Sequence, residues 1–481
     1  MRRSNSLPLT ETNHGAELLL RVRRGDGAAP LGRQVETGLR EAIRNGRLRA
    51  GERLPPSRTL AADLGVARRV VVEAFEQLAA EGWLDARVGS GTFVRRALPA
   101  LPRAQAGARL SDRPPPPRPR IDFFPGHPDL GMFPRQAWLR AEREALGRLP
   151  DSALGYSDPR GLRELRDAVA AYLGRVRGVV CRPHQVIICQ GAVQALGLIV
   201  RATASGDAPL RVAIEDPYLP EHRAVLDHAG AEVVPVPVDE LGVHDEAVAA
   251  ARAAVALVTP AHQFPTGVVL AAGRRAALAA WATRSDALIV EDDYDAEYRY
   301  DRQPVAALQG LAPERVAYLG SASKTLAPGL RLAWLVVPQE RLEAVAAAKR
   351  YADAGSPAIA QAALATLMRT GAYERHVRAA RRSQRTRRDA LRAAVREHLP
   401  GARLGGIAAG LHAIVHLERS VDAAALDAAA LRLGVRVYPL SWFSADPPPE
   451  TSAVVLGYGA LHPAAIGTGV AALADALAAV R

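Results

Sequence analysis

Apolar residues near the N-terminus recur every fourth position. Leu31, Val35, Leu39 and Ile43 form this series, which predicts an amphipathic helix over residues 31–45 that ends at Gly46. The elements expected after it are a helix capped by Ser57 and reaching Leu64, a turn at Gly65, a helix over 68–81, and strands over 83–86 and 91–94. Two helices joined by a turn and followed by a hairpin predict a small self-contained module over residues 31–96.

After residue 120 the hydrophobic pattern changes to short apolar runs that alternate with Ala- and Leu-rich helical stretches. The expected strands lie at residues 186–189, 211–214, 233–236, 255–259, 287–291, 315–319 and 332–337. This alternation predicts an α/β fold with a mostly parallel, seven-stranded sheet flanked by helices. Beyond about residue 345 helical patterns dominate. Strands are expected there only at 411–417 and 435–440, which predicts a smaller α+β domain.

Two segments carry no periodic pattern. Residues 1–30 are expected to form a flexible tail. Residues 97–120 contain seven prolines and carry a net charge of +4 (five Arg less Asp112), so they are expected to be a linker that is locally stiff along 114–117. The predicted organisation is therefore a tail, a module over 31–96, a linker over 97–120 and a large unit over 121–481.

Composition and charge narrow the class of protein. The 481 residues are 49% hydrophobic and 23% charged, which is typical of folded globular proteins and excludes wholesale disorder. The net charge of +12 favours a polyanionic partner, and residues 31–96 alone carry twelve Arg against eight acids. Two cysteines are too few for a disulfide framework, and we find neither a signal peptide nor a spanning segment. We expect a cytoplasmic protein with no membrane contact.

Lysine is rare in a chain that uses arginine almost everywhere. Of 62 basic residues only Lys324 and Lys349 are lysines. Lys324 lies in YLGSASKTLAPGLRLAW, a turn between two predicted strands that also holds Ser321, Ser323 and Arg331. Because a neutral lysine amine can form an imine with an aldehyde and arginine cannot, this turn predicts a Schiff-base site beside ligands for a phosphate. Lys349 lies in a helical run and is expected at the solvated surface.

Three further motifs follow predicted strands. CQGAVQALGLI opens a helix, where the backbone N–H groups of Gly191, Ala192 and Val193 would converge on an anion. VTPAHQFPTGVVL forms a turn through Pro265 and Gly267 that taken alone is equally consistent with an ordinary loop. IVEDDYDAEYRY places acidic residues at the end of a predicted strand, where they could act as a cap or as ligands of a metal ion. The absence of histidine from it argues against a metal, and we assign none.

The N-terminal module resembles the GntR-type DNA-binding domain, a winged helix-turn-helix, through LPPSRTLAADLGV, AFEQLAAEGWL and GSGTFV. Ala67 stands where the family usually has Ser. The alternative is that these arginines only solvate a helical face. The resemblance implies that operator DNA is contacted by the following residues: Ser57, Arg58, Arg68, Arg69, Gly89 and Gly91, the two glycines lying in a wing that approaches the minor groove.

The four motifs of the large unit, in their order, resemble fold-type I pyridoxal 5'-phosphate (PLP) enzymes. With the N-terminal module they resemble the MocR subfamily of GntR regulators, and LGYSDPRGLRELRDAVAAYL and LGYGALHP support this. The resemblance implies a head-to-tail homodimer in which Lys324 forms an aldimine with PLP, Asp292 pairs with the pyridine nitrogen and Tyr294 with the ring oxygen. It assigns the phosphate to these residues: Gly191, Ala192, Val193, Ser321, Ser323 and Arg331.

Two positions depart from the family pattern. Where its members tend to show Pro-Gly-Tyr-Pro, this chain has Pro217-Tyr218-Leu219-Pro220, so the aromatic that stacks on the ring falls on Leu219, with Tyr218 as the alternative. Trp442 stands where we look for the arginine that binds a substrate carboxylate, which leaves Arg223 and Arg436 as candidates. These departures favour a transcription regulator that senses PLP or an amino compound through an aldimine. The alternative is an active PLP-dependent aminotransferase with a DNA-binding appendage.

Overall fold

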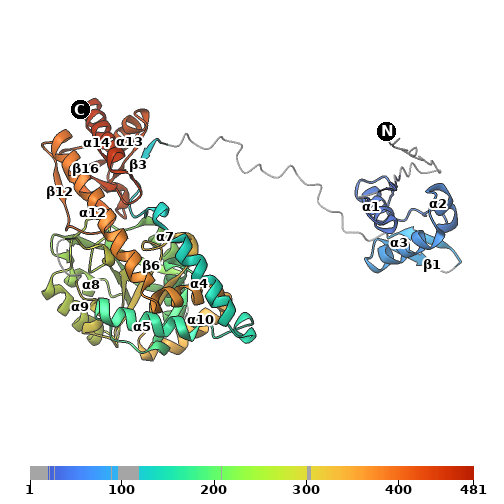
Figure 1. The fold of residues 1–481 in the computed structure, drawn as a ribbon, viewed down its shortest axis with the longest axis horizontal. Helices are drawn as coiled ribbons and strands as arrows, with labels where there is room; N and C mark the ends of the chain where they lie inside the picture. Colours follow the sequence, from blue (N-terminus) through green and yellow to red (C-terminus); the bar gives the residue numbers. More distant parts are fainter. Residues whose placement is uncertain are drawn as a thin grey trace. The chain divides into compact units, whose positions relative to one another are not determined.

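The computed structural model describes residues 20–480, apart from residues 21, 26–27, 88, 96–118, 207 and 301–304. The chain divides into two compact units, Met1–Pro116 and Pro117–Arg481 (Figure 1). Most of the predicted linker and residues 1–19 of the predicted tail lie outside the described residues. Each unit has its own hydrophobic core and is described by itself.

The first unit is a three-helix module with a terminal hairpin. Its elements are α1 (Leu31–Arg44), α2 (Ser57–Asp63), α3 (Arg68–Ala80), β1 (Leu84–Arg87) and β2 (Gly91–Val94), and the two strands pair antiparallel. The stripe seen in the sequence is buried, because Val35, Leu39 and Ile43 pack against α2 and α3. Leu20, which we placed in the tail, is buried in the same core.

The prediction that Ser57 caps the second helix is wrong. Ser57 is the first helical residue, and the capping position is held by Pro56, with no side-chain hydrogen bond. The proline ring fixes φ of Pro56 at −52°, and a residue with helical backbone angles directs its hydroxyl away from the first free amides. The Ser57 hydroxyl instead lies 3.5 Å from Nε of Arg68 at the start of α3.

A large, mostly parallel sheet organises the second unit, in the order β4-β11-β10-β9-β8-β5-β6-β7. All seven predicted strands are present. The eighth, β7, is a two-residue edge strand that pairs antiparallel with β6 and is too short to leave a periodic signal. The strands are β4 (Val186–Cys189), β5 (Leu210–Asp216), β6 (Ala231–Asp239), β7 (Gly242–Val243), β8 (Val255–Val258), β9 (Leu288–Asp293), β10 (Val316–Ser321) and β11 (Ala333–Val336).

Helices cover both faces of this sheet (Figure 1). One face packs against α6 (Ala192–Thr203), α7 (Pro220–His228) and α10 (Leu342–Asp353). The other face packs against α4 (Arg135–Arg148), α5 (Arg163–Arg177), α8 (Asp245–Ala250), α9 (Ala272–Arg284) and α11 (Ala358–Arg369). A sheet buried on both sides explains why its strands read as continuous apolar runs rather than as alternating patterns.

The C-terminal part forms the smaller α+β domain. The 27-residue helix α12 (Ala372–His398) connects the two domains (Figure 1): Tyr373 in its first turn packs into the core of the large sheet, and Leu391 in its second half packs into the core of the smaller domain. The remaining elements are β3 (Ile121–Asp122), β12 (Arg403–Gly405), β13 (His412–Asp422), α13 (Ala423–Arg432), β14 (Val435–Arg436), β15 (Tyr438–Pro439), β16 (Glu450–Gly457) and α14 (Pro463–Ala479).

The smaller domain is where the expected strands differ most from the structure. The strand predicted at 435–440 is two short strands in different sheets, because β14 pairs with β3 and β15 pairs with β16. The prediction missed β16, which holds the centre of a four-stranded antiparallel sheet ordered β12-β13-β16-β15. Among the helices that the structure describes, none is long and apolar enough to cross a membrane.

Candidate functional site

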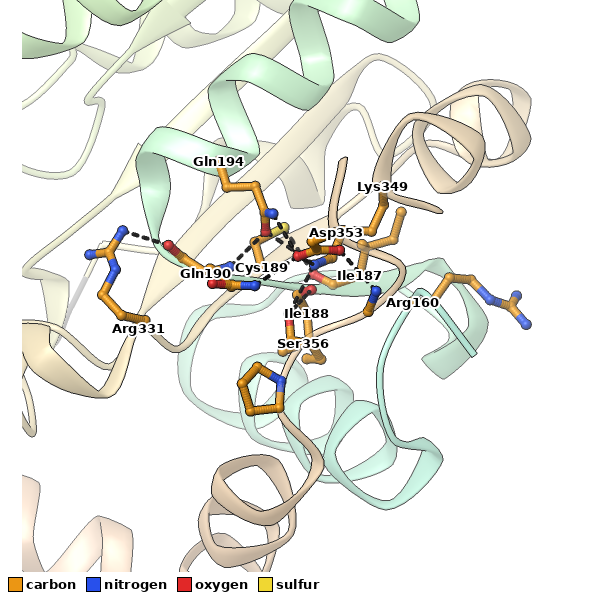
Figure 2. Close-up of polar contacts among 12 residues, drawn as sticks. Arg160, Ile187, Ile188, Cys189, Gln190, Gln194, Arg331, Lys349, Asp353 and Ser356 are labelled. Carbon is orange, nitrogen blue, oxygen red and sulfur yellow. Dashed lines mark hydrogen bonds and ion pairs between the residues drawn. The ribbon is translucent and has the colours of Figure 1, made fainter. Parts of the chain in front are cut away.

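The turn after β4 brings two predicted motifs together. Gly191 has φ of +95° and precedes the first residue of α6, Ala192. A Cβ on Gly191 would displace the guanidinium of Arg331, and the positive φ itself disfavours any residue other than glycine. Arg331 itself donates from Nη2 to the carbonyl oxygen of Gln190 at 2.5 Å (Figure 2). A guanidinium and the first amides of a helix therefore lie side by side, as an anion-binding cradle requires.

The lysine turn begins directly at the end of β10. Ser321 is the last strand residue, and its hydroxyl accepts a hydrogen bond from the backbone N–H of Ser323 at 3.3 Å. The carbonyl oxygen of Lys324 accepts from the Tyr298 hydroxyl at 2.9 Å, which fixes the backbone at the amine-bearing residue. Nζ of Lys324 points toward Gly126, where a Cβ would lie 3.4 Å away.

Burial sets the chemistry of the Lys324 amine. Desolvation lowers the pKa of Lys324, and the negative charges of Asp295 and Asp292 only partly oppose that effect. A lowered pKa increases the fraction of neutral amine, which is the nucleophilic form. The arrangement therefore suits covalent attachment of an aldehyde.

The three acidic residues at the end of β9 divide between the two faces of the sheet. Successive residues of a strand face opposite sides, so Asp292 shares a face with Val290 and α6, whereas Glu291 and Asp293 face the other helices. Asp292 accepts a hydrogen bond from the buried Tyr218 hydroxyl at 2.9 Å. Burial raises the pKa of Asp292 to about 7, although the hydrogen bond from Tyr218 acts in the opposite direction.

The acids on the other face have structural partners. Glu291 accepts the backbone N–H groups of Leu308 and Gln309, each at 2.9 Å. Asp293 is paired with Arg177 at 2.7 Å, and both side chains are almost fully buried. Across the described ranges no group of three His, Cys, Asp or Glu side chains is placed to hold a metal ion. This motif thus combines one carboxylate at the site with others that tie the sheet to its helices.

A buried histidine links the remaining motifs, and the sequence analysis did not single it out. Nδ1 of His262 lies 2.9 Å from a carboxylate oxygen of Asp295 and 3.2 Å from the Tyr294 hydroxyl. The ring of Phe264 meets that of Tyr294 edge-on at 6.0 Å. The signal in the sequence was the only histidine of VTPAHQFPTGVVL, whose partner lies 33 residues away and could not be inferred from spacing.

The positions that depart from the family pattern have defined surroundings. Leu219 packs with Phe264 and Phe443 in a small apolar cluster. Arg223 donates from Nη2 to the carbonyl oxygens of Tyr218 and Phe443 and lies 3.6 Å from Asp216. Both of its acceptors are backbone groups, so this guanidinium is already committed to holding the loop before α7.

The other candidate for a carboxylate lies in the smaller domain. Arg436 is on β14, with its guanidinium 5.8 Å from the centre of the Tyr438 ring. Its buried Nε has no hydrogen-bond partner among the described residues. Trp442 lies nearby in the turn Leu440–Phe443 and is partly exposed.

The prediction that Lys349 is a solvated surface residue is wrong. Its side chain is fully buried between α10 and α6, and it forms an ion pair with Asp353. Nζ also donates to Oε1 of Gln194 at 3.1 Å and to the Ser356 hydroxyl at 2.9 Å (Figure 2). A buried ammonium is tolerated here because each of its three N–H groups has an acceptor.

The predicted DNA contacts of the first unit lie at its surface. Arg58, Arg68 and Arg69 are all exposed, and Arg69 forms an ion pair with Glu73 one turn along α3 at 2.6 Å. Gly89 and Gly91, with φ of +77° and +107°, form the exposed turn of the hairpin.

Two arginines that the sequence analysis missed adjoin this hairpin. A Cβ on Gly91 would lie 2.9 Å from Nε of Arg53. The guanidinium of Arg87 stacks over the Phe93 ring at 5.2 Å. Arg53 lies before the segments that marked the module, so only the fold reveals its position beside the wing, whereas Arg87 lies at the predicted hairpin turn and was assigned no role there.

Comparison with known proteins agrees with this division of the chain. Residues 31–94 match the model for bacterial regulatory proteins of the gntR family, and residues 126–452 match the model for aminotransferases of class I and II. The pyridoxine biosynthesis transcriptional regulator PdxR of Corynebacterium glutamicum is 35% identical over 426 residues, covering 89% of this chain and 91% of that protein. The probable rhizopine catabolism regulatory protein MocR of Rhizobium meliloti is 35% identical over 479 residues, 95% of each chain.

The chain belongs to the MocR subfamily of GntR-type transcription regulators. Its larger unit also resembles the crystal structure of Pyrococcus horikoshii kynurenine aminotransferase in complex with PMP. The TM-score is 0.69 at 26% identity, covering 75% of this chain and 91% of that one. This MocR-type regulator thus combines a helix-turn-helix DNA-binding domain with an aminotransferase-like, PLP-binding domain.

The residues of this regulator fit PLP. The cradle of Gly191 and Arg331 leaves no space for a Cβ, Lys324 is a buried amine with a lowered pKa, and Asp292 is a buried carboxyl whose only hydrogen-bond donor among the described residues is Tyr218. When bound, PLP supplies an aldehyde for covalent attachment and a ring that acts as an electron sink.

Proposed function

We propose that PLP, or an amino compound that reacts with it at Lys324, controls how this regulator binds its operator DNA. The observation that carries the proposal is the buried Lys324 amine, whose pKa is lowered by desolvation, in the same chain as a DNA-binding unit with exposed arginines. One of only two lysines lies where an aldehyde cofactor needs a primary amine.

The proposed roles follow the surroundings of each side chain. Lys324 attaches the cofactor, Asp292 holds the pyridine nitrogen and Tyr294 the ring oxygen. Asp292 is suited to the nitrogen because burial raises the pKa of this carboxyl to about 7, so it shares a proton with a weak base at neutral pH. The phosphate is assigned to the following groups: the amides of Gly191, Ala192 and Val193, the hydroxyls of Ser321 and Ser323, and the guanidinium of Arg331.

The carboxylate of an effector would bind Arg436 and not Arg223, which holds the loop before α7. Arg223 is committed to two backbone carbonyls, which favours Arg436, with its unpartnered Nε, as the carboxylate ligand. The pyridoxine biosynthesis regulator PdxR, among the relatives, supports a vitamin B6 compound as the effector.

For the DNA-binding unit we propose contacts from Ser57, Arg58, Arg68 and Arg69 together with the wing at Gly89 and Gly91. A head-to-tail homodimer of the aminotransferase-like domains would present two such units, so the operator would hold two half-sites. The proposed location is the cytoplasm, where DNA is accessible and both cysteines, which are free in the structure, stay reduced.

The test is binding of the full-length chain to DNA fragments from around its own gene, measured by fluorescence anisotropy with and without PLP. PLP, alone or with an amino acid, should change the affinity or the footprint of the native protein and leave Lys324→Ala unchanged. Identical responses of the two proteins would contradict control through Lys324. Absence of specific binding under every condition would contradict the regulator itself.

An active aminotransferase with a DNA-binding appendage is the second candidate. The lysine, the aspartate and the phosphate cradle are all in place, and these are the groups that such an enzyme also needs. Many turnovers of amino and keto acids at enzyme-like rates would favour it, whereas a single half-reaction would favour sensing.

A further inference from the structure

Lys349, the second lysine of the chain, lies in a site that fits an ammonium and not a guanidinium. Its three acceptors are the carboxylate of Asp353, Oε1 of Gln194 at 3.1 Å and the Ser356 hydroxyl at 2.9 Å. An ammonium has three N–H groups and satisfies all three. A guanidinium has five in one plane and, in this fully buried site, would leave donors without partners. This explains why lysine persists in a chain that otherwise uses arginine.

The hydrogen bonds continue from Lys349 to Gln190, in the turn between β4 and α6 (Figure 2). Oε1 of Gln194, which accepts from Lys349, also accepts the backbone N–H of Gln190 at 2.8 Å. Asp353 accepts the side-chain amides of Gln190 at 2.9 Å and of Gln194 at 2.7 Å through the same oxygen. The ammonium of Lys349 thus holds both acceptors of Gln190, which are Oε1 of Gln194 and the carboxylate of Asp353.

Gln190 connects this network to the anion cradle. Its backbone N–H and side-chain amide face the Lys349 network, and its carbonyl oxygen accepts from Arg331 at 2.5 Å. The next residue is Gly191, where the cradle begins. Any displacement of Gln190 therefore moves the guanidinium of Arg331 and the first amides of α6 together.

The acid in this network is held in its charged form. Burial alone would raise the pKa of Asp353. The hydrogen bonds from Lys349, Gln194 and the backbone N–H of Gly355 outweigh it and lower that pKa. A charged, partly buried carboxylate must keep its partners, because removing one partner of such a pair leaves an uncompensated charge. The network is therefore ordered as a unit and can set the position of the turn.

We propose that Lys349 is a positioning residue for the phosphate of PLP, holding Gln190 so that the amides after Gly191 and the guanidinium of Arg331 converge. Lys349 touches neither the cofactor nor the lysine turn and acts through Gln194, Asp353 and Gln190. This inference rests on the proposed assignment of the phosphate to the cradle.

The test compares two ligands that differ only in the phosphate, PLP and pyridoxal, on the full-length chain carrying Lys349→Met. Methionine keeps the unbranched length and removes the charge. The Kd for PLP should rise about tenfold, the weakening of one charge-assisted hydrogen bond, while the Kd for pyridoxal changes less than about twofold. Equal changes for both ligands, or no change for either, would overturn the proposal.

Hydrogen exchange of the apoprotein gives a readout that does not depend on the cofactor. The backbone amide of Gln190 should exchange faster in Lys349→Met than in the native chain, because Oε1 of Gln194, which accepts from this amide, no longer accepts from Lys349 and is less firmly held. Arg163→Met is the matched control, since it removes the cation of an exposed pair at the same spacing on α5. It should leave both the ligand preference and the exchange unchanged.

A second variant covers the case in which Lys349→Met does not fold. Gln190→Ala keeps the buried pair of Lys349 and Asp353 and removes only the bond from Gln190 to Asp353. This variant should raise the Kd for PLP more than the Kd for pyridoxal, as Lys349→Met does. An unchanged ratio of the two Kd values would overturn the positioning role. A native chain that binds PLP no better than pyridoxal would instead contradict the cradle assignment, so the two failures are distinguishable.

Discussion

The hydroxyl of Tyr218 donates a hydrogen bond to Asp292 at 2.9 Å, and both side chains are buried. Tyr218 precedes the position at which the family places its stacking aromatic. In this regulator the tyrosine supports the carboxyl proposed to hold the pyridine nitrogen, and Leu219 packs into an apolar cluster. The hydroxyl of Tyr218 therefore acts on the charge of Asp292.

Substituting Tyr218→Phe removes the donor and keeps the ring. Burial raises the pKa of Asp292 to about 7, and the hydrogen bond from Tyr218 opposes this effect. Without that bond the pKa of Asp292 should be higher by about one pH unit, because one hydrogen bond to a charged acceptor stabilises the charged form by about that much. The measurement is a carbon-13 titration of labelled aspartate in the apoprotein, with the signal assigned by its absence from Asp292→Asn. An unmoved midpoint would show that the hydrogen bond does not act on the charge.

Asp292→Asn should stabilise the apoprotein while it weakens PLP binding. The folded pKa of about 7 lies above the ordinary value of 3.8, so the folded state binds more protons and loses stability as pH rises between these values. The increase in the free energy of unfolding caused by Asp292→Asn should grow from under about 1 kcal/mol at pH 4 to about 4 kcal/mol at pH 8. Thermal unfolding at several pH values measures it.

The control for that comparison is Asp167→Asn, whose side chain is 51% exposed on α5. This change should alter stability little at either pH, because an exposed carboxyl keeps its water in the folded state. If Asp292→Asn gave the same gain at pH 4 as at pH 8, burial of a charge could not be its cause.

The sequence could predict those parts of the site that depend on residue type and order. Lys324 stood out because an imine needs a primary amine, and the seven strands stood out because a sheet covered on both faces leaves apolar runs. The assignment of Asp292 and Arg331 came from the order of the motifs. The role of Lys324 came from one short segment, whereas the sheet and the roles of Asp292 and Arg331 came from the order of several segments along the chain.

The rest depends on contacts between distant segments. Lys349 lies in an Ala-rich helix, where periodicity does not show that α6 covers the lysine face. The commitment of Arg223 to the carbonyl of Phe443 joins residues 220 positions apart, and the pairing of β3 with β14 joins Ile121–Asp122 to Val435–Arg436. Such contacts appear only when the chain is folded.

Gly191→Ala should abolish tight PLP binding while the fold persists. The new Cβ would displace the guanidinium of Arg331, and φ of +95° strains any other residue by about 1–3 kcal/mol. The Kd for PLP, measured by fluorescence, should rise by more than about tenfold. Gly197→Ala, in open space on the same helix, should bind PLP normally and gain up to about 1 kcal/mol of stability. Equal affinity of the two variants would argue against the cradle.

DNA binding should depend steeply on salt. If 6–10 phosphates are contacted, affinity should fall roughly 10³–10⁵-fold between 50 and 200 mM salt. Arg58→Ala or Arg68→Ala should reduce the slope of log K against log salt by about one for each bound subunit, whereas Arg33→Ala, exposed on α1, should not. Anisotropy titrations at four salt concentrations measure these slopes. An affinity that does not change with salt concentration would contradict the proposed phosphate contacts.

The central claim is that Lys324 carries the cofactor, and borohydride reduction of the full-length chain with excess PLP tests it most directly. Mass spectrometry of the digested protein should find one pyridoxyl group, on the peptide that contains Lys324 and not on that of the buried Lys349. No pyridoxyl mass on Lys324 would contradict the account.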